Sequence, residues 1–239
     1  MSRRPADPAR RSARRRHGWA WAVLVLCVAL GAGIPVWSQA RESARFPLAA
    51  EDLDRARTEL ASLEVKGRAP KTGYDRDEFG TAWSDVDRNG CDTRNDVLAR
   101  DLTDVTYREG TGDCVVLTGT LVDPYSGTTI AFERGATSAA VQIDHVVALS
   151  DAWQKGAQQW TAGQRTEFAN DPANLLAVDG PTNQAKGAGD AATWLPPSTG
   201  YRCAYVAQQI RVKAAYGLWV TPAERDAMDR QLDTCVVAD

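Results

Sequence analysis

The chain has 239 residues, of which 44% are hydrophobic and 8% aromatic, and this composition excludes an intrinsically disordered protein. Residues 1–40 hold 7 of the 28 basic and 1 of the 31 acidic residues, so the remainder has 21 against 30 and a net charge of −9. This acidic balance excludes a broad polyanion-binding surface. Any contact with nucleic acid must come from a local basic patch or from a metal ion.

The first 40 residues have the composition of an export signal. Seven Arg precede an almost wholly apolar stretch from Trp19 to Trp37, and the small residues Ser38 and Ala40 follow it. We predict either a signal peptide cleaved after Ala40 or an uncleaved membrane anchor over residues 19–37. Both alternatives place the rest of the chain outside the cytoplasm, secreted or anchored at the cell membrane.

The following stretches predict an α+β domain over residues 71–239, preceded by a linker and an amphipathic helix over 41–70. Two β-prone runs flank the turn sequence Asp123-Pro-Tyr-Ser-Gly127, which predicts a hairpin. A third β-branched run ends at residue 149. Further elements are predicted from periodicity and capping signals: a second helix opened by Thr161 and Gln164, a short strand at 175–178, a helix from Pro181, and helices at 201–216 and 221–232.

The sequence Asp85-Val-Asp87-Arg-Asn89-Gly90 is similar to the start of a calcium-binding EF-hand loop. The similarity ends there, because Asp92 and Asp96 stand where an apolar residue and a Glu are usual. The alternative is a hydrogen-bonded turn that leads into a helix at 95–101.

The cysteines predict two disulfides. Cys27 belongs to the export segment, so four cysteines, an even number, remain in the part of the chain that we expect to be exported. Of the three possible pairings we expect Cys91 with Cys114 and Cys203 with Cys235, because each would close a local unit. A zinc site is the alternative, and the absence of any Cys-x-x-Cys spacing argues against it.

The residues that could carry chemistry share one stretch: Asp144, His145, Asn174, Asn183 and Lys186. His145 is the only His beyond the export segment. Its ordinary pKa of ~6.5 suits a general base, and the Asp144 carboxylate can bind a hard divalent cation. Because neighbouring side chains of a strand point to opposite faces, both can serve one site only where the strand bends or ends. Asn183 and Lys186 share a face if they lie on a helix.

This ordered set resembles the HNH endonucleases, whose core is a ββα-metal fold, also called a His-Me finger. Their pattern is an acidic or His residue before a general-base His, then Asn-Leu, then a His or Asn nine residues after that Asn, and Lys three further on. The motif core covers residues 141–187, and a wider likeness to exported bacterial members covers most of 70–235. Two departures are Asn183 in place of the final His and the missing Cys pairs of a structural zinc.

The resemblance implies a ββα-metal core with an N-terminal β-hairpin region and added helices, held by disulfides. It implies a monomeric metal-dependent endonuclease that cleaves nucleic acid, DNA ahead of RNA, leaving 5′-phosphate and 3′-hydroxyl ends. His145 would activate water, and Asp144 and Asn183 would hold one divalent ion, Mg²⁺ ahead of Mn²⁺ or Zn²⁺. The remaining roles would be orientation of the His-bearing loop by Asn174 and pairing of a phosphate oxygen by Lys186 or Arg94.

Two other function classes remain open. A non-catalytic exported binding module on an HNH-like scaffold, stabilised by calcium at Asp85, Asp87 and Asn89, is favoured by the acidic net charge. A different hydrolase ranks last, because no Ser or Cys nucleophile motif stands beside His145.

Overall fold

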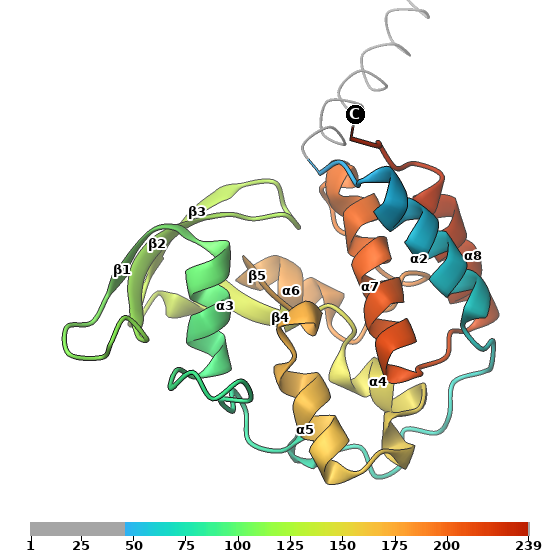
Figure 1. The fold of residues 1–239 in the computed structure, drawn as a ribbon, viewed down its shortest axis with the longest axis horizontal. Helices are drawn as coiled ribbons and strands as arrows, with labels where there is room; N and C mark the ends of the chain where they lie inside the picture. Colours follow the sequence, from blue (N-terminus) through green and yellow to red (C-terminus); the bar gives the residue numbers. More distant parts are fainter. Residues whose placement is uncertain (1–45, 239) are drawn as a thin grey trace, which may run out of the picture. The chain divides into compact units, whose positions relative to one another are not determined.

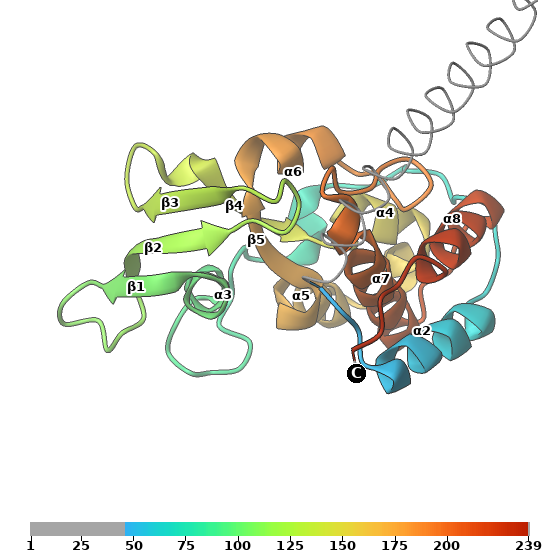
Figure 2. The same cartoon turned by 90° about the horizontal axis from the view of Figure 1, so that it is seen from above.

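The computed structural model describes residues 46–238 as two antiparallel sheets with helices packed around them (Figures 1 and 2). The predicted export segment at residues 1–40 lies outside the described residues. Within residues 46–238, no helix is long and apolar enough to cross a membrane. The α+β class and both predicted disulfides are confirmed.

The first sheet contains the predicted hairpin. Strands β2 (Val116–Val122) and β3 (Thr129–Glu133) pair antiparallel, and the Asp123 carboxylate accepts hydrogen bonds from the backbone N–H of Ser126 at 2.7 Å and of Tyr125 at 3.3 Å. Sequence reasoning missed the third strand, β1 (Thr103–Tyr107), which is short, mostly polar and irregular in register. Helix α3 (Thr93–Asp101) packs against this sheet, and the Cys91–Cys114 disulfide ties the segment before α3 to the start of β2.

The second sheet is formed by two strands that lie far apart in the sequence. Strand β4 (Val141–His145) pairs with β5 (Leu175–Asp179) from Val141 opposite Asp179 to His145 opposite Leu175. The predicted helical insert between them contains α4 (Leu149–Gln154) and α5 (Ala162–Asn170), and α5 begins with the predicted capping box. Helix α6 (Gly180–Lys186) follows β5 directly and packs on the β4–β5 pair.

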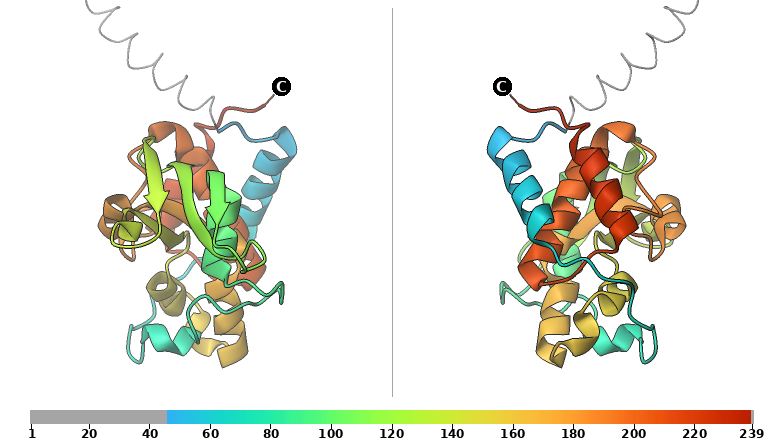
Figure 3. Two further views of the ribbon diagram at one scale, coloured as in Figure 1. Left: turned by 90° about the vertical axis from the view of Figure 1, so that its left-hand side faces the viewer. Right: turned by 90° about the vertical axis from the view of Figure 1, so that its right-hand side faces the viewer.

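Three helices form a layer beside the second sheet (Figures 1 and 3). They are α2 (Ala50–Ser62), α7 (Arg202–Tyr216) and α8 (Pro222–Leu232), all of which the sequence predicted. Their shared core includes Leu60, Ile210 and Met228, and the Cys203–Cys235 disulfide joins the start of α7 to the end of α8. Short 3-10 turns complete the fold: η1 (Arg76–Phe79), η2 (Ser138–Ala140), η3 (Ala157–Gln159), η4 (Pro172–Asn174) and η5 (Thr199–Tyr201).

A buried ion cluster connects α4 to α7 and α8. Lys155, just after α4, places Nζ 2.7 Å from Asp151, 2.9 Å from Asp190 and 2.6 Å from Glu224. Lys213 of α7 contacts Asp151 at 3.1 Å and Glu224 of α8 at 2.9 Å. The partly exposed Arg68 contacts Asp151 at 3.1 Å and Asp190 at 2.5 Å. Three cations and three carboxylates therefore neutralise one another, which a set of buried charges requires.

The ion cluster predicts a loss of stability in acid. Burial alone would raise the pKa of Asp190, but Lys155 and Arg68 outweigh it and lower that pKa to about 2. The unfolded chain, with an ordinary Asp pKa of about 3.9, takes up the proton first, so this contribution is present above about pH 4 and is lost as pH falls towards 2. Urea unfolding between pH 5 and pH 2.5 should show less of this loss in Asp190→Asn than in the parent chain.

The matched control for this test is Asp226→Asn, because Asp226 is exposed on α8. Its acid dependence should follow the parent chain. Equal acid losses in the parent and in Asp190→Asn would contradict the assignment.

The Cys203–Cys235 bond should stabilise the fold substantially. It links residues 32 apart in sequence, and closing a loop of that size in the unfolded chain corresponds to about 3 to 4 kcal/mol. The double variant Cys203→Ser with Cys235→Ser should lose this amount of unfolding free energy in urea denaturation. An unfolding midpoint that reducing agent leaves unchanged in the parent chain would disprove the expectation.

Candidate functional site

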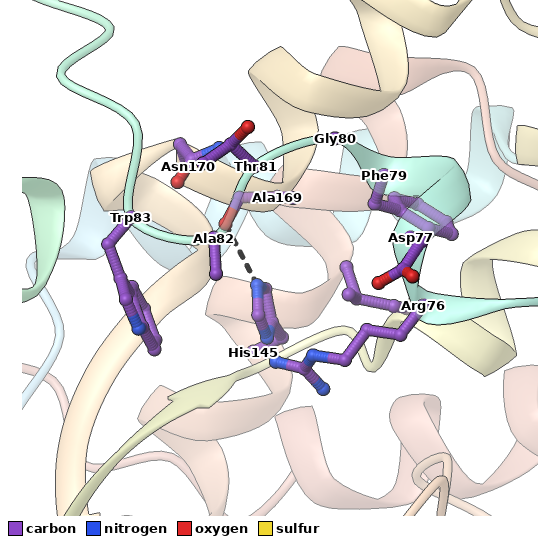
Figure 4. A pocket seen from close by; sticks show the side chains of 11 residues that line it. Arg76, Asp77, Phe79, Gly80, Thr81, Ala82, Trp83, His145, Ala169 and Asn170 are labelled. Atoms are coloured by element: carbon purple, nitrogen blue, oxygen red, sulfur yellow. Dashed lines mark hydrogen bonds between the residues drawn. The ribbon is translucent and has the colours of Figure 1, made fainter.

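A cavity of about 490 Å³ brings several predicted site residues together at the end of β4. Of the predicted residues it is lined by Arg94, Asp144, His145 and Asn183. A second cavity of about 80 Å³ also borders His145 (Figure 4). Asn174 and Lys186 do not line either cavity, and both are buried.

The His145 ring is neutral, and one of its two nitrogens is used in a hydrogen bond to the backbone. Its Nε2 lies 2.8 Å from the backbone carbonyl oxygen of Ala169, at the end of α5 (Figure 4). A carbonyl oxygen only accepts, so Nε2 must carry the proton, and in the neutral ring Nδ1 keeps the lone pair. Burial is the main reason that the pKa of His145 falls to about 3, with Arg76 and Lys186 acting in the same direction. The ring is therefore neutral across the physiological pH range.

Asp144 and His145 meet the geometric condition for sharing a site because β4 ends at His145. The Asp144 carboxylate accepts a hydrogen bond from Tyr125 Oη at 2.7 Å and contacts Lys186 Nζ at 2.9 Å. Burial raises the pKa of Asp144, and Lys186 opposes that rise. Lys186 Nζ also donates to the His145 carbonyl oxygen at 2.7 Å, so its three donors are largely occupied inside the protein.

Asn183 and Asp144 are the oxygen donors that could hold a hard cation. The Asn183 side-chain N–H donates to Gln142 Oε1 at 3.0 Å, which leaves the Asn183 oxygen as an acceptor. One or two protein oxygens with remaining water ligands suit Mg²⁺, so an ion held by Asp144 and Asn183 stays a prediction. Within residues 46–238, no group of three or more His, Cys, Asp or Glu side chains is arranged to hold a metal.

Asn174 fixes the backbone that leaves His145. Its Oδ1 accepts from the N–H of Val147 at 2.8 Å, its side-chain N–H donates to the Val147 carbonyl at 3.3 Å, and its own carbonyl accepts from Val146 at 2.8 Å. This places Asn174 where the predicted role in orienting the His-bearing loop requires it. Its effect on catalysis stays a prediction.

Sequence reasoning missed Arg76 and Trp83, which line both cavities beside His145 (Figure 4). They belong to a segment that packs across α5: Arg165 Nε donates to the Glu78 carbonyl at 2.8 Å. Gly80 allows this approach, because its φ is +78° and an added Cβ would collide with the Thr166 hydroxyl. No local pattern in the sequence reveals that this segment reaches a strand more than sixty residues away.

The predicted cation Arg94 also reaches the large cavity. Its pKa is lowered, first by burial and then by the neighbouring Arg134. Its Nη2 makes a long contact of 3.4 Å with the Val141 carbonyl oxygen, and no ion pair of Arg94 exists among the described residues. Arg76 likewise has no ion-pair partner within the part of the chain that the structure describes.

The EF-hand-like sequence forms a hydrogen-bonded turn. The Asp85 carboxylate accepts from the N–H of Asn89 at 3.1 Å and of Gly90 at 2.9 Å, and Asp87 also accepts from Asn89 at 3.1 Å. The turn leads into α3, which the turn interpretation predicted. These contacts use the carboxylates that the calcium interpretation needs as ligands.

Comparison with known proteins places the chain in a family. Residues 92–231, more than half of the chain, match the family described as GmrSD restriction endonucleases, C-terminal domain. The chain belongs to this family. It is also 41% identical over 182 residues to an uncharacterized secreted protein of Arthroderma benhamiae, a match that covers 75% of this chain and 84% of the relative. No solved structure matches it.

The span that matches the GmrSD C-terminal domain covers only part of the candidate site. Residues 92–231 include Arg94 and the whole stretch from β4 to α6, whereas Arg76 and Trp83 precede the matched span. Membership supports the predicted nuclease relationship. The relative is a fungal protein, so a bacterial branch stays a prediction.

The double contact of Asn174 predicts its effect on stability. Asn174→Ala would leave the buried N–H and carbonyl of Val147 without their side-chain partners, at about 1 to 3 kcal/mol for a buried group left unpaired. Urea denaturation should therefore show a loss of about 2 to 6 kcal/mol for the two groups together. Asn183→Ala is the matched control, because Asn183 is only half-buried and its side chain bonds to another side chain. Equal losses in the two variants would contradict the role of Asn174.

Proposed function

We propose that the protein is a metal-dependent endonuclease that hydrolyses phosphodiester bonds of nucleic acid with His145 as the general base. The observation that carries this proposal is the neutral His145 ring, whose Nε2 is committed to Ala169 while Nδ1 keeps its lone pair beside a cavity with two arginines. Membership in the family of GmrSD restriction endonuclease C-terminal domains supports nucleic acid as the substrate class.

In this proposal the chemistry of the chain begins with a water molecule at His145. Nδ1 takes a proton from the water as its oxygen attacks phosphorus, and the bond from phosphorus to the 3′ oxygen breaks. The leaving oxygen takes a proton from solvent, which gives a 3′-hydroxyl and a 5′-phosphate. Because Nε2 already donates to a fixed carbonyl, the ring keeps its orientation while its charge changes.

Asp144 and Asn183 are the residues that would hold a divalent ion. Such an ion, when bound, supplies charge stabilisation at the scissile phosphate. Tyr125 and Lys186 position the Asp144 carboxylate from inside the protein, so we assign Lys186 to positioning Asp144. We assign the pairing of phosphate oxygens to Arg94 and Arg76, whose guanidinium groups can bind two oxygens at once.

The fold around this site supports the same proposal. Strands β4 and β5 form an antiparallel pair, and α6 follows and carries Asn183, which is the order of a ββα-metal core. We infer that this unit is that core, with a 29-residue helical insert between the strands at 146–174. The two disulfides and the secreted relative support an extracellular location.

The decisive test is cleavage by the purified full chain. It is incubated with plasmid, linear DNA and RNA, each in Mg²⁺, Mn²⁺ or Zn²⁺, and products are followed by electrophoresis. We expect His145→Ala to lose about 100- to 10,000-fold in rate, the usual contribution of a general base. Arg76→Ala should lose about 100-fold or more, as expected for a cation that stabilises developing charge.

The control is Val86→Ala, because Val86 is 41% exposed in the segment that carries Arg76 but lines neither cavity. Its rate should equal that of the parent chain. If the parent chain and His145→Ala behave alike in every metal and with every substrate, the proposed function is wrong.

A further inference from the structure

Trp83 has an unusual setting beside His145. The two rings are nearly parallel, with 14° between their planes and 6.3 Å between their centroids. The Trp83 ring packs in part against the core under α3 and β2, yet it remains partly exposed and lines both cavities that border His145, the smaller of which is drawn in Figure 4. Within residues 46–238 the indole N–H has no hydrogen-bond partner, so this polar group is left to solvent or to a ligand.

The backbone at Trp83 is also strained. Its φ is +61°, a conformation that is a genuine outlier for a bulky residue and costs of the order of 1–3 kcal/mol. Burial of the Trp83 ring does not by itself explain why the fold tolerates this strain, since the ring remains partly exposed. The strained backbone instead holds an aromatic face at the edge of the cavity that contains His145.

Cations and a second aromatic ring accompany Trp83. Tyr74 and Arg76 line the same large cavity from the same segment, and Arg94 lines it from α3. Aromatic rings interleaved with cations in a groove are the usual means of holding single-stranded nucleic acid, whose bases stack on the rings. In a duplex the base faces are already stacked, so Trp83 could take a base only after that base had left the helix.

The charge of the chain favours a single strand for a separate reason. A duplex contacted over its length requires many cations, whereas residues 41–239 carry a net charge of −9. The cavity supplies Arg76 and Arg94, enough for one or two phosphates of a single strand.

We propose that Trp83 is a stacking platform for an unpaired nucleobase, and that the chain therefore acts on single-stranded nucleic acid. This inference rests on the proposed function, because it concerns the base of the nucleotide next to the phosphate that would be cleaved at His145. Tyr74 lines the same cavity and offers a second aromatic contact. Because residues 74–83 precede the span that matches the family, this recognition belongs to the part of the chain outside the matched domain.

The test measures binding without cleavage. In the His145→Ala background of the full chain, the affinity for a fluorescent single-stranded oligonucleotide and for its duplex is measured by anisotropy. We expect the single strand to bind more tightly. Trp83→Ala should weaken single-strand binding by about 5- to 150-fold, the usual effect of removing one stacking ring. Trp83→Phe should restore most of it, and Val86→Ala should change nothing.

A purely structural role for Trp83 gives a different pattern. In that case Trp83→Ala lowers the unfolding temperature but binds the single strand as tightly as the background chain, which overturns the inference. Preferential binding or cleavage of the duplex overturns it too, while cleavage that depends on His145 keeps the proposed function. Conversely, single-strand binding that depends on Trp83 in a chain that cleaves nothing supports the stacking platform alone and disproves the nuclease proposal.

Discussion

Neutralisation of buried charge is the constraint on which the rest of the structure depends. Lys155 and Lys213 are fully buried, and each needs the carboxylates of Asp151 and Glu224 at salt-bridge distance. Removing one partner of such a set leaves an uncompensated charge inside the protein, which typically costs 3–5 kcal/mol. The ion cluster thereby fixes α4 against α7 and α8, and α4 is the helix that begins four residues after His145.

A second polar network fixes the site itself around Asp144, near the end of β4. Tyr125, from the turn between β2 and β3, and Lys186, from α6, both hold Asp144, so the first sheet and the ββα unit meet at this carboxylate. The carbonyl oxygen of Ala169, in the last turn of α5, has no partner within its own helix and accepts a hydrogen bond from His145. His145, the proposed general base, is thus oriented by a helix end and stays neutral because it is buried.

The residues of the proposed site come from two parts of the chain. The proposed base and metal ligands lie within the span that matches the family, whereas Arg76 and Trp83, proposed to contact the substrate, lie before it. The segment that carries them is anchored by Arg165 of α5 and by the close approach at Gly80, so it is placed by packing against the same helix that orients His145. A change in this segment is therefore expected to alter the proposed substrate contacts while His145 and its carbonyl partner stay in place.

The sequence by itself determined the local elements, because caps, turns and apolar periodicity act over a few residues. These elements include the hairpin around Asp123 and the capping box at Thr161. The sequence also predicted both disulfides and the order Asp144, His145, Asn174, Asn183. It missed β1, which is short and mostly polar and whose inward residues Val105 and Tyr107 are only half-buried. Only the tertiary structure decided that Lys186 binds Asp144 and that Arg76 and Trp83 flank His145. Burial and long-range packing set these contacts, and neither leaves a pattern in neighbouring residues.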